Sequence, residues 1–275
     1  MKFEEGILRI ESVKDFSEMD SVNKDEVTSV IVSKSVKTLK KGLFEGFENL
    51  KEAEIPEVKI IGEDVFFRCK NLEKINMSRV DAIGKRAFFS CESLQKLDMP
   101  NLKSAGGDAF RDCKQLEEIN MPKVERIATC AFHQCKCLKN LYTPNLEKLE
   151  MSAFRGCDVL EKVYAPNVIN VGDVAFFGCK GLRVLDMSNL EEVGRGAFMG
   201  CTKLEKLNML NLKSTGEEAF RSCKQLKEIN MPKLEKIGEM AFFDCKNLEE
   251  VHIPEETYDK YKEEFEDTKV TGVSK

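Results

Sequence analysis

The chain of 275 residues has no tryptophan, only two histidines and only four tyrosines. Its apolar runs are far shorter than the roughly 20 residues that cross a bilayer as a helix. The amino terminus also lacks the charged and then apolar pattern of a signal peptide. The 43 basic and 48 acidic residues are mixed along the chain, which leaves no basic stripe. We therefore expect no nucleic-acid partner and no membrane insertion.

Motifs of catalysis are missing as well. The sequence contains no phosphate-binding loop, no nucleophile elbow and no dinucleotide-binding glycine pattern. The two histidines, His133 and His252, are far apart in the sequence. Pairs of acidic residues are common, but a composition that is 33% charged produces them by chance. We predict that the protein is not an enzyme and has no catalytic residues and no cofactor.

Cysteine, by contrast, is abundant and regularly spaced. Phenylalanine recurs every 22 residues from Phe44 to Phe242, and leucine does so from Leu50 to Leu248. Self-similarity at a fixed period of this length indicates a repeat architecture. Nine of the eleven cysteines keep the same interval, at positions 69, 91, 113, 135, 157, 179, 201, 223 and 245.

One repeat has the sequence LKEINMPKLEKIGEMAFFDCKN (226–247), and its parts predict three segments. The stretch L-x-x-I-x-M ends in alternating apolar residues before a proline, which is typical of a strand. The stretch L/V-x-x-I/V-G predicts a second extended or turn segment, in which glycine permits a backbone conformation that other residues resist. The stretch A-F-x-x-C is too short for a full helix and predicts a helical turn.

Stacking of such units buries apolar residues that no single repeat can bury. The sequence therefore predicts a repeat solenoid with parallel strands and a column of phenylalanines inside. About eleven repeats of 22–23 residues occupy 27–254, and residues 1–26 are predicted to form an N-terminal cap. Residues 255–275 are predicted to form a C-terminal capping helix and tail, because Tyr258, Tyr261 and Phe265 have helical spacing. A helix that binds a partner is the alternative for this segment.

The motif L-x-x-I-x-M-P followed by I-G-x-x-A-F-x-x-C resembles the leucine-rich repeats of the BspA-like family over residues 27–254. The resemblance implies a leucine-rich repeat solenoid, a curved right-handed coil with parallel β-strands on the concave face. Turns, short strands and helical turns are implied elsewhere. It also implies protein binding or adhesion, since many members are surface-exposed proteins of bacteria and protists. Family repeats are often a residue longer, and the export signals of surface members are missing here.

The periodic cysteines are interpreted as reduced, structural residues. A small thiol is often buried, and stacked thiols point in parallel, which is awkward for disulfide geometry. The stretch CAFHQCKC (130–137) is the one cluster with the composition of a metal site, offering Cys130, His133, Cys135 and Cys137. Its spacing matches no zinc pattern, and Cys135 belongs to the periodic column. We therefore predict no metal site.

A binding site is expected among the side chains that the scaffold leaves free. Counting from each strand leucine, the third and fifth positions should point inward and the second and fourth outward. The outward positions are mostly small polar or charged residues, except in the middle of the array. Exposed tyrosine is enriched at binding hot spots, so this middle region is predicted to bind protein. The predicted patch consists of Tyr142, Tyr164, Asn140, Lys162 and Val184.

The sequence thus predicts a non-enzymatic protein–protein interaction module that binds a protein ligand through its concave face, in adhesion or host interaction. Two alternatives stay open. The chain could be a purely structural or engineered array without a dedicated ligand, and the tyrosines could merely cover a core thinned by Thr143 and Ala165. The sequence as given predicts a cytoplasmic protein. A cell-surface or secreted location follows if the habit of the family holds and an export signal has been removed.

Overall fold

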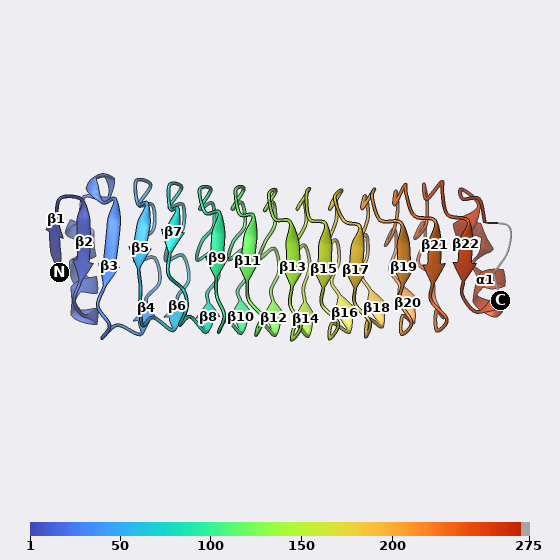
Figure 1. The fold of residues 1–275 in the computed structure, drawn as a ribbon, viewed down its shortest axis with the longest axis horizontal. Coiled ribbons are helices and arrows are strands. Elements are labelled where there is room, and N and C mark those ends of the chain that lie inside the picture. The colour runs from blue at the N-terminus through green and yellow to red at the C-terminus, as the bar shows by residue number, and fades with distance from the viewer. Residues whose placement is uncertain (271–275) are drawn as a thin grey trace.

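A computed structural model describes residues 1–270 of the chain. The chain winds into an elongated solenoid of about eleven turns, whose coils lie side by side between the two termini at opposite ends (Figure 1). All strand pairings are parallel except the first, between β1 and β2. The predicted fold class, a parallel-strand repeat solenoid, is confirmed.

One face of the solenoid carries the longer strand of each coil, and we call it the strand face. Most of its residues pair with the residue 22 positions later, as Tyr142 does with Tyr164. The first pairing, Ser29 with Glu52, spans one residue more and accommodates the extra residue of the first repeat. The strands are β3 (Ser29–Val32), β5 (Glu52–Glu54), β7 (Lys74–Ile75), β9 (Lys96–Asp98), β11 (Glu118–Asn120), β13 (Asn140–Tyr142), β15 (Lys162–Tyr164), β17 (Val184–Asp186), β19 (Lys206–Asn208), β21 (Glu228–Asn230) and β22 (Glu250–His252).

A second row of two-residue strands runs along the solenoid next to the strand face (Figure 1). These strands form one continuous parallel sheet, so the stretch L/V-x-x-I/V is extended as predicted. They are β4 (Thr38–Leu39), β6 (Ile60–Ile61), β8 (Ala82–Ile83), β10 (Ser104–Ala105), β12 (Arg126–Ile127), β14 (Lys148–Leu149), β16 (Asn170–Val171), β18 (Glu192–Val193) and β20 (Ser214–Thr215).

The glycine after this second strand is needed for a different reason from the one predicted. Gly84 and Gly106 do not have the positive φ that would favour glycine. Instead, a Cβ atom on Gly84 would lie 2.6 Å from the backbone carbonyl carbon of Gly62, and one on Gly106 would lie 2.7 Å from that of Gly84. The coils approach so closely here that no side chain fits between them.

The stretch A-F-x-x-C was predicted to form a helical turn, and this prediction is wrong. The stretch forms a series of turns, which we call the turn arm. Each phenylalanine is flanked, two positions away on both sides, by residues of positive φ, such as Asp64 (φ 58°) and Arg68 (φ 59°) around Phe66. Left-handed residues interrupt a helix. Alternate N–H groups of the arm donate to the next coil, as that of Phe66 does to the carbonyl oxygen of Ala87 at 2.8 Å, whereas that of Cys69 donates within the arm to the carbonyl oxygen of Phe66 at 3.1 Å.

The core contains the predicted column of phenylalanines. From Phe44 to Phe242 each ring is buried and stacks on the ring of the next coil, with centroids 5.0–5.5 Å apart. Burial of one such ring is worth roughly 1.5–3 kcal/mol. The strands alternate as predicted, so that Leu97 is buried between exposed Lys96 and Asp98.

The nine periodic cysteines are buried beside this column, and all eleven cysteines, which lie within the described residues, are free thiols. Each periodic thiol donates to the backbone carbonyl of the phenylalanine one coil earlier, with Sγ–O distances of 3.1–3.4 Å. The carbonyl of Phe66, for example, accepts the S–H of Cys91 and the N–H of Cys69. The cysteine column therefore links consecutive coils, a role that the sequence did not show.

The amino-terminal segment joins the strand face. β2 (Ile7–Ile10) pairs in parallel with β3, and β1 (Lys2–Glu4) pairs antiparallel with β2. The 3-10 helices η1 (Val13–Ser21) and η2 (Lys24–Glu26) connect β2 to β3. β1 therefore occupies the edge of β2 on which a further coil would pair. The predicted boundary between residues 26 and 27 stays a prediction.

The carboxy-terminal segment contains α1 (Glu255–Lys260) and the 3-10 helix η3 (Lys262–Phe265). Residues 271–275 of the predicted tail lie outside the described residues. Phe265 is buried and stacks on Phe242 with the centroids 5.2 Å apart. This segment thus adds one more ring to the phenylalanine column. The boundary between residues 254 and 255 stays a prediction.

Two carboxylates of this segment bind the backbone of the last turn arm. Asp267 Oδ2 accepts the N–H of Asp244 at 3.1 Å, and Glu264 Oε2 accepts that of Ala241 at 3.2 Å. In the coils before, the N–H equivalent to that of Asp244 donates to a carbonyl of the next coil. Asp267 therefore supplies the acceptor that a further coil would supply.

We predict that the native protein has two reactive thiols. Cys130 and Cys137 are partly exposed, whereas the periodic thiols are buried. Burial raises the pKa of thiols such as Cys91 and Cys135 well above its usual value, and it also raises that of Cys130, which a reagent can nevertheless reach. Because the thiolate is the reacting form, a thiol reagent should label two cysteines quickly in the native state and all eleven in denaturant. The Cys130→Ser/Cys137→Ser variant should lose the fast phase. Fast labelling of nine further thiols would contradict this core.

We also predict that the two carboxylates protect the last coil. The Glu264→Ala/Asp267→Ala variant should speed amide hydrogen exchange over 226–247, because each lost hydrogen bond is worth about 1 kcal/mol. The Glu263→Ala/Glu266→Ala variant is the control, since it removes the same charge from neighbouring side chains that make no hydrogen bond in the described structure. Equal acceleration in both variants would show that charge matters and the contacts do not.

Candidate functional site

The structure brings the five residues of the predicted patch together on β13, β15 and β17. They point outward because the residues between them, such as Leu141 and Val163, are buried. The parallel register also adds Asp186 to the group, which the sequence analysis left out. It sets the side chains in two rows, Asn140, Lys162 and Val184 in one and Tyr142, Tyr164 and Asp186 in the other.

The two tyrosines form a stacked pair that faces solvent. Their ring centroids are 5.0 Å apart and the ring planes differ by 11°. Tyr142 is 60% exposed and Tyr164 is 38% exposed, and Val184 on the next strand is 51% exposed. Neither phenol has a side-chain hydrogen-bond partner among residues 1–270. The pair therefore presents apolar ring surface and two unused hydroxyl groups from a strand framework.

On both sides of this patch, the outward side chains bind one another. Asn140 and Lys162, in contrast, take part in no side-chain hydrogen bond or ion pair within the described part of the chain. The polar groups of the patch are thus available to a partner, whereas those beside it are already occupied. The occupied pairs are Lys74–Glu52 (3.0 Å), Lys96–Glu118 (3.0 Å), Asn120–Asp98 (2.7 Å), Lys206–Glu228 and Asn230–Asn208 (2.9 Å).

The core below the patch is thinner than in the coils on either side. Thr143 and Ala165 are buried where those coils have Met121 and Met187. The Thr143 hydroxyl donates to the carbonyl oxygen of Tyr164 at 3.4 Å. Because successive strand residues point to opposite sides, the tyrosine rings do not fill the space that the smaller residues leave. If the tyrosines serve only to pack, as in the alternative to a binding role, the contact that they provide is the one between the two rings.

The repeat also breaks at Glu150, where most coils have glycine. Its carboxylate accepts the N–H of Thr129 at 3.0 Å and pairs with Arg126. Burial acts to raise the pKa of Glu150, but the hydrogen bonds from Arg126 and Thr129 outweigh it and hold the pKa below its usual value. Glu150 follows β14 of the second strand row, so its local pairing stabilises the irregular coil outside the patch.

The stretch 130–137 does not assemble the metal cluster that its composition resembles. Cys135 is buried and donates to the carbonyl oxygen of Phe110 at 3.2 Å, whereas Cys130 and Cys137 are partly exposed. Their donor atoms do not converge with that of His133. Among the described residues, one group of three such side chains has its donor atoms within 4.8 Å of one another, and it consists of Glu228, Glu250 and His252.

The structure shows a hollow in the strand face that the sequence analysis missed. It lies over β7, has a volume of about 360 Å³ and is lined by Ile75, Lys74, Lys96 and Asp98 among others. Ile75 is only partly buried there, although its column was predicted to point inward. β7 pairs with β5 but not with β9, and the ladder of the strand face is likewise interrupted between β11 and β13 and between β17 and β19. The regular repeat gave no signal of these interruptions.

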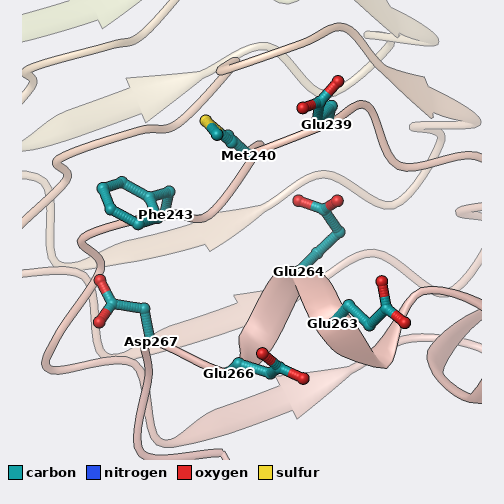
Figure 2. A pocket seen from close by; sticks show the side chains of 7 residues that line it. All are labelled: Glu239, Met240, Phe243, Glu263, Glu264, Glu266 and Asp267. Carbon is teal, nitrogen blue, oxygen red and sulfur yellow. The ribbon is translucent and has the colours of Figure 1, made fainter.

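A second pocket, of about 430 Å³, lies at the carboxy-terminal end (Figure 2). Met240 and Phe243 on the last turn arm line one side, and η3 carries Glu264 on the other. Burial raises the pKa of Glu264 against the opposing effect of its backbone hydrogen bonds. Because Glu264 and Asp267 already bind the turn arm, this pocket is the seam between the last coil and the carboxy-terminal segment.

The chain is similar to several solved structures. A leucine-rich repeat protein from Bacteroides ovatus is 25% identical, with 91% of this chain and 84% of that one covered and a TM-score of 0.51. A leucine-rich cell surface protein from Faecalibacterium prausnitzii is 22% identical, with 85% and 81% covered and a TM-score of 0.43. A leucine-rich repeat protein of T. pallidum is 23% identical, with 66% and 79% covered and a TM-score of 0.49. No curated protein matches the chain.

The stacked coils, the strand face and the phenylalanine column define a leucine-rich repeat solenoid. A family model described as the BspA type leucine-rich repeat region matches residues 20–139 and 147–271, in six copies. The chain belongs to this family, as its motifs predicted. Membership points to protein interaction or adhesion as the general role. Within the described residues, no helix has the length and apolar character needed to cross a membrane.

Proposed function

We propose that the protein is a non-enzymatic interaction module that binds a protein ligand through the strand face, centred on Tyr142 and Tyr164. The family supports the general role, and the stacked, exposed tyrosine pair is the observation that carries the site. Cell-surface adhesion is the setting that we propose for this binding, because BspA-type proteins are typically surface-associated.

The patch has the features of a binding hot spot. Tyrosine offers a large contact area and loses little conformational entropy, since only two side-chain torsions must be fixed. Here the rings are already ordered by stacking, so binding costs less entropy than for free side chains. Val184 adds apolar surface, while Asn140 and Lys162 offer hydrogen bonds at the edge. A partner with an apolar centre and polar rim would match this arrangement.

A purely structural array is the second candidate function. The regular lateral pairing over most of the strand face favours it, because such pairs stabilise the array without any ligand. In this case the stacked tyrosines would belong to the same lateral pairing. The two candidates differ in what removal of the rings should change, namely partner affinity or stability.

We predict that the Tyr142→Ser/Tyr164→Ser variant loses its partner but keeps its fold. The partner is first captured from a surface extract of the source organism by a photo-crosslinking residue placed at position 186, beside Tyr164, with position 208 of the same column as the comparison. Affinity of that partner for the double variant should fall by about 30-fold or more, which corresponds to the 2 kcal/mol typical of hot spots. Isothermal titration calorimetry measures this loss.

The matched control is the Asn208→Ser/Asn230→Ser variant, which changes the same column on β19 and β21. It should retain the affinity of the wild type. Thermal unfolding of both variants should stay close to the wild type, because substitutions of exposed side chains usually change stability by less than about 0.5 kcal/mol. Unchanged affinity together with a lowered unfolding temperature for the tyrosine variant would instead support the packing alternative.

A further inference from the structure

The last two strands of the strand face hold a cluster of metal-binding side chains. β21 and β22 pair in register, so that Glu228 lies opposite Glu250 and Asn230 lies opposite His252. Donor atoms of Glu228, Glu250 and His252 all lie within 4.8 Å of one another. The three side chains come from adjacent strands and point to the same side. The cluster is three to four coils from Tyr164 along the same face and is separate from the tyrosine patch.

The charges in this cluster are only partly balanced by the protein. Along the same outward column, Glu52 is paired with Lys74 and Glu118 with Lys96. Glu228 has one cationic neighbour, Lys206, on its amino-terminal side. Glu250 has no ion-pair or side-chain hydrogen-bond partner in the described part of the chain. Its cross-strand neighbour is another carboxylate, and like charges that face each other across a ladder are destabilising.

The donor set has the composition of a transition-metal site. Zn²⁺ binds imidazole nitrogen at about 2.0–2.1 Å and carboxylate oxygen at about 2.0–2.2 Å. Tetrahedral donors at these distances are about 3.4 Å apart, so the side chains need to close by little more than about 1 Å. Their partial or full exposure leaves room for that rotation. Mg²⁺ and Ca²⁺ prefer oxygen ligands alone, and the imidazole therefore favours a transition metal.

The backbone of the cluster is held in place on both strands. The carbonyl oxygen of His252 accepts the N–H of Met231 at 2.8 Å, which fixes its main chain against the coil before. Ile229 and Val251, which lie beside the ligands on each strand, are fully buried. Only the side-chain torsions then need to adjust when an ion enters. Three protein ligands leave at least one coordination position open to water or to a ligand atom of a partner.

We propose that Glu228, Glu250 and His252 form a binding site for one divalent transition-metal ion of the Zn²⁺ class, at the carboxy-terminal end of the strand face. The ion replaces the missing countercharge of Glu250 and competes with Lys206 for Glu228. The site departs from the expectation that the chain has no metal site, which considered only the cysteine-rich stretch 130–137.

The test is a titration of the full chain, freed of metal by a chelator, with Zn²⁺ in a calorimeter. Cys130 and Cys137 are replaced by serine throughout, so that partly exposed thiols do not contribute. We expect one ion per chain, and affinity about tenfold or more weaker in His252→Ala and in Glu250→Gln. The control His133→Ala should leave the affinity unchanged. Lys206→Met should tighten binding, because it frees Glu228 from its competing cation.

Two results would overturn the proposal. One is the absence of any saturable Zn²⁺ binding by the cysteine-substituted parent chain. The other is binding that His252→Ala and Glu250→Gln leave unchanged, which would place the ion elsewhere. Circular dichroism of each variant shows whether the fold is retained, and the gain of affinity expected for Lys206→Met does not depend on a loss of structure. A folded Lys206→Met chain with weakened binding would also contradict the proposed ligand set.

Discussion

In this solenoid, each coil depends on its neighbours for the hydrogen-bond partners of its backbone and for the packing of its core. The turn arm has left-handed residues on both sides of every phenylalanine, so it does not continue as a helix, and alternate N–H groups donate to the next coil. The phenylalanine rings stack at the same step, and each periodic thiol binds the carbonyl of the coil before. The glycine after the second strand keeps the coils close enough for all these contacts. Stability is therefore a sum of nearest-neighbour terms, as expected for repeat proteins.

This dependence on neighbours makes the two ends the points that need special structure. At the amino-terminal end, β1 runs antiparallel and occupies the edge of β2. At the carboxy-terminal end, Phe265 extends the ring column, and Asp267 supplies a carboxylate oxygen in place of a carbonyl. The helical spacing of the aromatic residues indicated that a segment covers the last coil. The substitution of a carboxylate for a backbone acceptor has no sequence signature, because any acidic residue near the end would look the same.

The period of 22 residues was sufficient to predict the solenoid and its inward and outward columns. A repeating side chain must find the same environment in every coil, so the phenylalanine and cysteine columns had to be buried. The sequence did not reveal why particular residue types occupy some positions of the repeat. The glycine was attributed to backbone conformation, but the structure shows that it is needed because of the close approach of Gly62 and Gly84. The pattern A-F-x-x-C gave no sign of positive φ, since Asp64 and Arg68 are not glycines.

The same periodicity limits where a site can arise. Side chains that hold consecutive coils together cannot vary, so the proposed ligand site lies among the outward columns of the strand face. Where these columns repeat, neighbouring side chains neutralise each other, as in Lys96–Glu118 and Asn120–Asp98. Outward polar side chains that already pair with one another contribute little to the affinity for a partner. The nearly identical stretches 109–127 and 219–237 thus represent the same structural unit used twice. Free binding capacity remains where the columns change, at the stacked tyrosines in the middle and at the carboxylates and His252 near the end.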